Sequence, residues 1–298
     1  MKTPPVGLGM WLRAMDFISH HPSNQGHGIR WVARYVGWQL WKRLARRPRL
    51  VELINGIRVK AYPDSRGAGL VIYTGLPEYD DMLFAFRYLR HDEGFVDVGA
   101  NIGVYTLLAA SKAPNGIVLA FEPNPTAATR LIENIKLNGF TNVVVREVAV
   151  GAFKGSVRVT STLDVQNRVA MASDGGPTLD VALTTLDMET SDQKKIALVK
   201  LDTEGFESEV LKGAARLLDQ NPAPVWIVEV NGLGQRYGGG DAAILDAFQR
   251  HGYRPFKYDA TLNRLQPRSE TDLRSEWNLI FIRDKADVVD RLAASHAL

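Results

Sequence analysis

The chain has 298 residues, of which 45% are hydrophobic and 23% are charged. This length allows a substantial hydrophobic core, and the formal net charge of +3 is too small to indicate a nucleic-acid partner by itself. The absence of cysteine excludes disulfides, thiolate metal sites and cysteine nucleophiles.

A basic, aromatic segment comes first, over residues 30–49, with seven Arg or Lys and no acid. Basic helices rich in Trp can lie at an anionic membrane surface, so a peripheral membrane contact stays open. The interpretation that we favour is a helix whose aromatic residues pack on the domain behind it. The same aromatic residues leave a homodimer contact open. No apolar run is long enough to span a membrane and no signal-peptide pattern is present, so we expect a cytoplasmic protein.

Two strand-like runs follow this segment, at residues 50–62 and 70–75. Asn55 and Gly56 lie within the first run and predict a hairpin turn. Residues 80–90 have the pattern of an amphipathic helix.

From residue 94 onward, strands alternate with helices of about 10 to 15 residues, which predicts a parallel sheet with helices on both faces. The expected core strands are FVDVGA, IVLAFEP, VVVREVAVG, IALVKLD and VWIVEVN. Their nearly continuous apolar runs are typical of strands buried on both sides. Residues 253–259 and 277–284 look like two strands with only a loop between them, which indicates an antiparallel strand at the end of the sheet.

These patterns divide the chain into two parts. We expect an N-terminal extension over residues 1–90, with the basic aromatic helix, the hairpin and a lead-in helix. We expect an α/β domain over residues 91–298, with an insertion of short polar and β-like pieces at 152–185.

The stretch GFVDVGANIGVYT places Gly99 and Gly103 where a strand turns into a helix. Glycine lets a ligand approach the backbone closely, and a helix N-terminus offers unpaired N–H groups. The next strand ends in Glu122, where a carboxylate can accept hydrogen bonds from both hydroxyls of a ribose. A nucleoside-bearing cofactor is therefore predicted, either a dinucleotide or S-adenosylmethionine.

The charge of the site distinguishes these two cofactors. The dinucleotide fingerprint G-x-G-x-x-G serves a pyrophosphate, whereas the turn here reads G-A-N-I-G and lacks the three glycines. Asp97 stands where an acid can bind the amino group of a methionine moiety. Together with Glu122 it suits a cationic cofactor, so S-adenosylmethionine is favoured and an NAD-dependent oxidoreductase is the alternative.

With these motifs in view, the sequence resembles the FkbM family of S-adenosylmethionine-dependent methyltransferases. The matching stretches within residues 94–232 are VDVGANIGVYT, AFEPNP, REVAVG, LVKLDTEGFESEVLKGA and VWIVEVN. The resemblance implies a Rossmann-like, seven-stranded methyltransferase sheet with an antiparallel last strand. It also implies O-methylation, commonly of a sugar or natural product, so we expect a small-molecule or glycan acceptor with a free hydroxyl.

The cofactor is expected at the ends of the first two strands. Asp97 binds its amino group and Glu122 binds its ribose hydroxyls in this hypothesis. The other expected cofactor-binding residues are Gly99, Ala100, Asn101, Gly103, Thr106, Asn124, Ala149 and Val150. The last three would flank the adenine. Glu78 matches an acid of the family and would cover the cofactor or meet the substrate. The alternative is an acid at the start of the helix over residues 80–90.

Methyl transfer to an alcohol needs a base or a metal near the hydroxyl. Lys200, Asp202 and Glu204 stand at the carboxyl end of the fourth strand. We expect Asp202 and Glu204 to act as base and substrate orienter, with Lys200 keeping a carboxylate ionised. The alternative for Glu204 is to cap the following helix. Glu229 ends the fifth strand and is the remaining expected catalytic residue.

Metal binding at this edge of the sheet is an open alternative that we do not favour. Mg²⁺ would take oxygen ligands from Asp202, Glu229 and Asn231, and Asn231 is otherwise expected to contact the substrate. A non-catalytic membrane-surface scaffold that keeps the fold is a further alternative, which the retained acids oppose. We expect no nucleic-acid partner, because the chain has no Asn-Pro-Pro-Tyr-like motif.

Overall fold

The computed structural model describes residues 15–26, 28–161, 167–193, 195–269 and 277–295. They belong to two compact units, Met1–Tyr79 and Asp80–Leu298. Each unit has its own secondary structure and its own buried residues, so we describe them separately.

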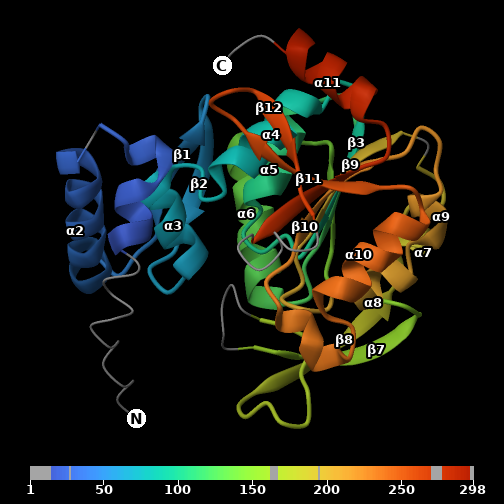
Figure 1. The fold of residues 1–298 in the computed structure, drawn as a ribbon. Coiled ribbons are helices and arrows are strands. Elements are labelled where there is room, and N and C mark those ends of the chain that lie inside the picture. Colours follow the sequence, from blue (N-terminus) through green and yellow to red (C-terminus); the bar gives the residue numbers. More distant parts are fainter. Residues whose placement is uncertain (1–14, 27, 162–166, 194, 270–276, 296–298) are drawn as a thin grey trace. The chain divides into compact units, whose positions relative to one another are not determined.

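The first unit contains a β-hairpin and α-helices (Figure 1). Its described elements are the 3-10 helix η1 (Pro22–Asn24), α2 (Gly28–Leu44), β1 (Arg49–Ile54), β2 (Ile57–Ala61) and α3 (Arg66–Thr74). The strands β1 and β2 pair in antiparallel orientation. Asn55 and Gly56 form their turn with φ of 48° and 78°, which confirms the hairpin prediction. In the described parts of the chain, no helix has both the length and the hydropathy needed to cross a bilayer.

The expected strand at residues 70–75 is wrong, because this run belongs to α3. The Ser65 side chain caps the helix by accepting a hydrogen bond from the N–H of Ala68. Gly75, with φ of 76°, ends it. The periodicity of a short apolar run does not distinguish a strand from a buried helix. Here the capping residues at either end, Ser65 and Gly75, indicate a helix.

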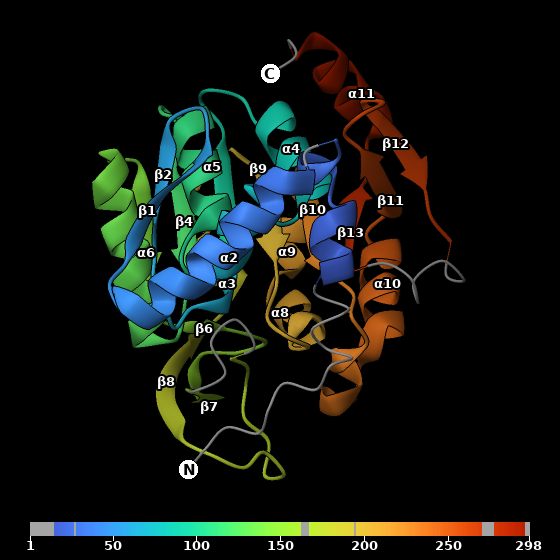
Figure 2. The ribbon, with the colours of Figure 1, turned by 90° about the vertical axis from the view of Figure 1, so that its left-hand side faces the viewer.

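The second unit is built around an eight-stranded sheet with the order β12-β11-β13-β10-β9-β3-β4-β5 (Figures 1 and 2). In chain order the strands are β3 (Gly94–Val98), β4 (Val118–Phe121), β5 (Val143–Arg146), β9 (Ile196–Leu201), β10 (Val225–Glu229), β11 (Arg254–Asp259), β12 (Arg264–Pro267) and β13 (Asn278–Ile282). Five neighbouring strands of this sheet are mutually parallel, namely β10, β9, β3, β4 and β5. Strand β13 is antiparallel to both of its neighbours, β10 and β11.

This topology confirms the α/β prediction and the antiparallel last strand. The seven expected strands are all present, and β12 adds an eighth as a hairpin partner of β11. Helices α4, α5 and α6 cover one face of the sheet, and α8 and α10 cover the other (Figure 1). The helices of this part of the chain are α4 (Tyr79–Tyr88), α5 (Val104–Lys112), α6 (Pro125–Asn138), α7 (Leu186–Glu189), α8 (Glu207–Lys212), α9 (Ala215–Leu218), η3 (Leu233–Tyr237), α10 (Gly240–Arg250) and α11 (Lys285–Ala294).

A separate three-stranded sheet has the order β6-β8-β7. Its strands are β6 (Ala149–Val150), β7 (Gly155–Thr160) and β8 (Thr178–Thr184). The expected third core strand, VVVREVAVG, is therefore wrong in its second half. Only β5 joins the main sheet, whereas β6 leaves it to pair in parallel with β8.

Aromatic side chains pack together in the core of the second unit. Phe248 of α10 stacks on Phe281 of β13 with ring centroids 4.0 Å apart, and Trp226 of β10 meets Phe248 edge-on. All three side chains have no exposed surface, and aromatic rings bury large apolar areas. The buried strands thus fix the positions of the polar residues at their carboxyl ends.

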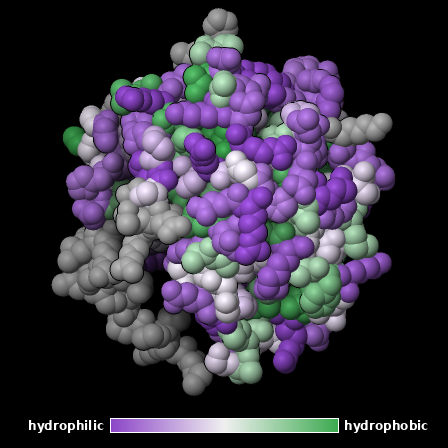
Figure 3. All heavy atoms as spheres, turned by 45° about the vertical axis from the view of Figure 1, so that its right-hand side comes forward, coloured by the Kyte–Doolittle hydropathy of each residue, from purple (hydrophilic) through white to green (hydrophobic). Residues whose placement is uncertain are grey.

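The surface differs from this core in composition. The face drawn in Figure 3 is mostly hydrophilic, with hydrophobic side chains in small patches.

Candidate active site

Gly99 follows β3 directly and brings its backbone against the chain that follows β9. Its φ is 84°, and a Cβ atom at this position would lie 1.7 Å from the carbonyl oxygen of Asp202. The N–H of Asp202 in turn donates to the carbonyl of Val98. No other residue type fits such a contact, so this glycine joins two strand ends directly.

The five backbone N–H groups of residues 99–103 all donate to protein acceptors. Those of Gly99 and Ala100 reach the carbonyl of Phe121, each at 3.0 Å. The turn therefore satisfies its own backbone N–H groups, so polar recognition of a ligand here depends on nearby side chains. The unpaired N–H groups were expected at the N-terminus of the following helix α5, and that expectation stays a prediction.

Two buried carboxyl groups stand beside this turn. Asp97 on β3 is 2% exposed, and its Oδ2 accepts a 2.6 Å hydrogen bond from Thr106 Oγ1. Burial raises the pKa of Asp97 to about 6, although the Thr106 hydrogen bond and the charge of Lys200 oppose that rise. The Asp97 carboxyl therefore loses its proton near pH 6, and its carboxylate form gains from a cationic partner.

Glu122 follows β4 and links the turn to α6. Its Oε2 accepts from the N–H of Asn101 and its Oε1 from the N–H of Asn124, both at 2.8 Å. Burial raises its pKa to about 7, against these two hydrogen bonds. Each carboxylate oxygen can accept a second hydrogen bond, so Glu122 retains capacity for ribose hydroxyls.

The residues expected around the adenine have structural roles of their own. The side-chain oxygen of Asn124 caps α6 by accepting from the N–H groups of Thr126 and Ala127. Ala149 and Val150 are buried in the small sheet, as strand β6. Their placement beside a bound adenine stays a prediction.

Three acids meet at the ends of β9 and β10. One carboxylate oxygen each from Asp202, Glu204 and Glu229 can be chosen so that all lie within 4.8 Å of one another. Glu229 is 8% exposed, and its Oε2 has no hydrogen-bond partner. Burial, followed by the charges of Asp202 and Glu204, raises the pKa of Glu229 far above its ordinary value. The sequence-based grouping of these acids at one sheet edge is reproduced.

Glu204 lies in a tight turn that other residues support. Its φ of 56° is left-handed, a conformation that costs roughly 1–2 kcal/mol for a residue with a side chain. Burial and the charge of Asp202 raise its pKa to about 8. The buried carboxylate of Glu207 holds this turn by accepting from the N–H groups of Thr203 and Gly205. Sequence analysis missed Glu207, whose signal was its place as an acid in the first turn of α8.

Lys200 supplies a buried positive charge next to Asp202. Its side chain is 2% exposed, and its Nζ donates to Asp202 Oδ2 at 3.1 Å and to Asn278 Oδ1 at 3.2 Å. The ammonium also lies 5.3 Å from the ring centroid of Tyr105. Sequence analysis did not single out Asn278 or Tyr105. Asn278 had one signal, as a polar residue at the head of the apolar run NLIFI.

The two predicted substrate-binding residues lie in different units. Asn231 follows β10 in the second unit, and its side-chain oxygen accepts from the N–H of Leu233, so this atom is already engaged. Glu78 is half-buried near the end of the first unit. Their contact with a substrate stays a prediction.

These residues fit a nucleoside cofactor with a cationic end. Buried carboxyl groups at Asp97 and Glu122 flank the turn, and the uncompensated Oε2 of Glu229 lies in the adjacent acid cluster. An anionic pyrophosphate would be repelled by the Asp97 carboxylate, whose pKa of about 6 leaves it ionised at neutral pH. Together with the sheet order, the site defines a methyltransferase of the Rossmann-like class.

Comparison with known proteins gives the family. The sequence profile of the methyltransferase FkbM domain matches residues 97–255. The chain thus belongs to the FkbM family of S-adenosylmethionine-dependent methyltransferases.

Individual relatives are distant. Methyltransferase 1 of Beauveria bassiana is 28% identical over 145 residues, which cover 41% of this chain and 58% of that protein. The hexuronic acid methyltransferase AglP of Haloferax volcanii is 27% identical over 191 residues, covering 64% of this chain and 78% of that protein. The crystal structure of precorrin-6y C5,15-methyltransferase from Geobacter metallireducens aligns with a TM-score of 0.39 and 16% identity, covering 69% of this chain and 86% of that one.

Proposed function

We propose that the chain methylates a hydroxyl oxygen of a sugar, a glycan precursor or another hydroxylated small molecule. S-Adenosylmethionine supplies the methyl group. Asp97 binds the amino group of this cofactor, and Glu122 binds its ribose hydroxyls. The other expected cofactor-binding residues enclose the rest of it, and these are Gly99, Ala100, Asn101, Gly103, Thr106, Asn124, Ala149 and Val150.

The acid cluster with Lys200 is the observation that carries this proposal. The cluster adjoins the turn, because Asp202 contacts Gly99 and its charge raises the pKa of Asp97, after the larger effect of burial. Asp202 is our candidate base for the acceptor hydroxyl. Lys200 balances its charge and fixes its position through the 3.1 Å hydrogen bond. Lys200 is a positioning residue, since it is 2% exposed.

Glu204 and Glu229 have a different role in this proposal. Burial and the charge of Asp202 raise the pKa of both, so each holds a proton near neutral pH. A protonated carboxyl donates a hydrogen bond, which suits the orientation of an acceptor oxygen. In this proposal Asp202 is the base, and the protonated carboxyl groups of Glu204 and Glu229 are hydrogen-bond donors.

The acidity of the cluster favours a hydroxyl acceptor over a carboxylate. One named relative is a hexuronic acid methyltransferase, and a uronic acid offers both kinds of oxygen. A carboxylate would meet the negative charge of Asp202 at close range. A neutral sugar hydroxyl avoids that repulsion and needs the base that Asp202 provides.

The experiment that tests this proposal is an acceptor screen with radiolabelled S-adenosylmethionine. Neutral glycans, uronic-acid glycans and hydroxylated natural products would be offered, and each labelled product would be treated with mild alkali. A methyl ether survives that treatment and supports the proposal. A methyl ester is hydrolysed and would move the chemistry to a carboxyl group.

A divalent cation is a second candidate occupant of the acid cluster. Hard cations prefer carboxylate oxygens, and a cation beside Glu229 Oε2 would compensate that buried atom. Asp202, Glu204 and Glu229 would be its ligands, rather than the set with Asn231. Mg²⁺ titration followed by calorimetry tests this role, with Glu229→Gln as the binding variant. Heat that disappears in Glu229→Gln supports a cation site, and no heat in either protein restricts the cluster to proton transfer.

A further inference from the structure

Helix α2 of the first unit presents an apolar stripe to solvent. The stripe residues follow one another at spacings of three and four, which puts them on one face of a helix. They are Ile29, Val32, Val36, Leu40 and Leu44, with exposed fractions of 88, 43, 48, 51 and 81%. Trp38 is the buried residue of α2, at 1% exposed. The helix thus buries one side through Trp38 and still leaves an apolar stripe exposed.

Positive charge lies in the same segment as this stripe. Residues 30–49 include seven Arg or Lys and no Asp or Glu, and four of the seven, Arg30, Arg34, Lys42 and Arg43, lie on α2. A helix with an exposed apolar face and basic flanks has the composition of an interfacial helix, which lies in the headgroup region of a membrane. An ordinary surface helix of a soluble domain has its polar residues on the face turned to solvent.

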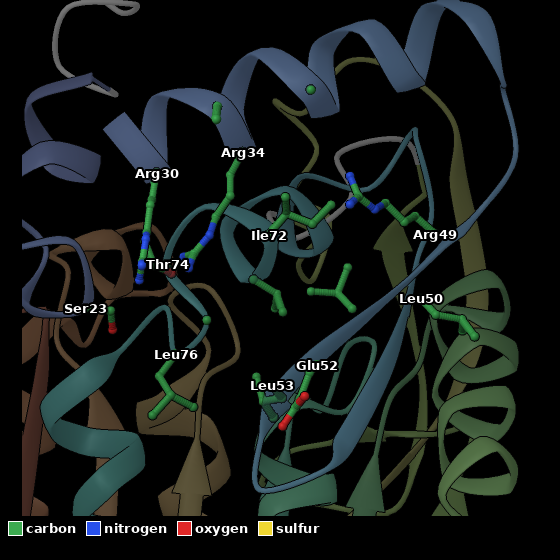
Figure 4. Close-up of a pocket in the computed structure, with 15 residues that line it drawn as sticks. Ser23, Arg30, Arg34, Arg49, Leu50, Glu52, Leu53, Ile72, Thr74 and Leu76 are labelled. Atoms are coloured by element: carbon green, nitrogen blue, oxygen red, sulfur yellow. The ribbon is translucent and has the colours of Figure 1, made fainter. Parts of the chain in front are cut away.

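A groove of about 920 Å³ lies beside α2 and supplies a second observation. Arg30 and Arg34 extend into it from α2, and Arg49 reaches it from the start of β1 (Figure 4). Among the described residues, no acid forms an ion pair with these three arginines. Glu52 also lines the groove, where its Oε1 accepts from the N–H of Gly56.

The rest of the groove wall is largely apolar. Leu53, Ile72 and Leu76 contribute side chains from β1 and from the α3 region (Figure 4). Guanidinium groups bind phosphate oxygens in paired hydrogen bonds. A groove with several guanidinium groups over apolar walls therefore matches a phosphate headgroup joined to an apolar tail.

We propose that the first unit docks on an anionic membrane surface through α2. The stripe enters the interface, and the arginines of the groove bind lipid phosphate groups. Charge complementarity favours this occupant over a second copy of the chain, because two basic α2 surfaces in a symmetric contact would repel each other. The stripe favours a membrane over a dissolved phosphate compound, because such a compound would leave the apolar side chains of Val36 and Leu40 exposed to water.

Vesicle flotation tests the proposal on the full chain. The vesicles are phosphatidylcholine alone or phosphatidylcholine with phosphatidylglycerol, at low and at physiological salt. We expect the wild type to float with the anionic vesicles only. The variant Val36→Asp/Leu40→Asp should lose at least ten times in vesicle affinity. Leu262→Asp, which changes a 65% exposed leucine of the second unit, should bind as the wild type does.

A second variant, Arg30→Gln/Arg34→Gln, examines the groove. It should lose the preference for anionic vesicles, and thermal unfolding should show that each variant remains folded. The absence of wild-type binding at low salt would overturn the proposal. So would full binding by Val36→Asp/Leu40→Asp, which would leave a purely electrostatic contact or a dissolved anion. Light scattering measures the molar mass in solution as a last test. A dimer that Val36→Asp abolishes would show that the stripe contacts a second copy of the chain and would overturn the membrane proposal.

Discussion

Asp97 and Lys200 are register partners on the parallel strands β3 and β9. Lys200 lowers the pKa of Asp97 while burial raises it, and the outcome is a pKa of about 6. The same ammonium donates to Asp202 Oδ2. One buried lysine therefore acts on both the expected cofactor carboxylate and the expected base.

Removal of the Asp97 carboxylate should weaken cofactor binding. We expect Asp97→Ala to bind S-adenosylmethionine at least about tenfold less tightly, because a charge-assisted hydrogen bond contributes roughly 1.5–3 kcal/mol. Isothermal titration measures the affinity, with Asp246→Asn on the exposed face of α10 as the control. Near-wild-type affinity in Asp97→Ala would show that the cofactor amino group binds elsewhere.

The pH dependence of cofactor binding should report on Lys200. Wild-type affinity for S-adenosylmethionine should fall as the pH drops below the Asp97 pKa of about 6, because protonation removes the negative charge. Lys200→Met should move this loss to higher pH, since the ammonium that lowers the Asp97 pKa is gone. Titration calorimetry between pH 5 and 8 measures the shift. An unchanged pH profile in folded Lys200→Met would contradict the coupling.

The base should be separable from the cofactor site. Asp202→Asn should bind S-adenosylmethionine as the wild type does and lose about 10²- to 10⁴-fold in turnover, which is the usual contribution of general base catalysis. The measurement is the initial rate with an acceptor from the screen, beside the binding constant. Normal turnover in Asp202→Asn would assign the base to another residue.

The acid cluster should make folding stability depend on pH. The pKa of Glu204 is raised from its ordinary 4.5 to about 8 by burial and by Asp202, and that of Glu229 is raised further. Groups that bind protons more tightly when folded stabilise the protein below pH 4.5, and this contribution is lost as the pH rises through the folded pKa. The free energy of unfolding should therefore fall between pH 5 and 9 without divalent cations.

Glu229→Gln should flatten this dependence and raise the stability at pH 9, because the amide cannot ionise. Urea unfolding at several pH values measures it, with Glu209→Gln on the first turn of α8 as the control. A Glu229→Gln profile as steep as the wild-type one would show that Glu229 does not hold a proton in the folded state.

Gly99 should be essential for folding. Gly99→Ala would place its Cβ atom 1.7 Å from the carbonyl oxygen of Asp202, at a φ of 84°. Gly139, which caps α6 at a φ of 69°, has nothing within 4 Å of the same atom. Gly139→Ala should cost roughly 1–2 kcal/mol from backbone strain alone, and Gly99→Ala clearly more. Equal unfolding free energies for the two variants would contradict the close approach.

The sheet of the second unit was predictable because its strands carry their own signal. The buried strands have continuous apolar runs between glycine-rich turns, and their order along the chain fixes which ends share an edge. For that reason the proximity of Lys200, Asp202 and Glu229 could be predicted from the sequence. The departure of Ala149 and Val150 to the small sheet was not predictable, since it depends on pairing with β8, about 30 residues later.

The remaining contacts depend on three-dimensional neighbours that the sequence does not display. Asn278 reaches Lys200 from 78 residues away through the antiparallel insertion of β13. Glu207 supports the left-handed turn at Glu204 from the next helix. The N–H groups of Gly99 and Ala100 reach the carbonyl of Phe121 because β3 pairs with β4, which a glycine pattern does not reveal.

The central claim is that the turn after β3, with Asp97 and Glu122, holds S-adenosylmethionine. The most direct test is isothermal titration of the wild type and of Glu122→Gln with S-adenosylmethionine, S-adenosylhomocysteine and NAD. We predict micromolar binding of both sulfur compounds, no binding of NAD, and a clear loss of affinity in Glu122→Gln. Binding of NAD alone, or equal affinity in Glu122→Gln, would contradict the site described here.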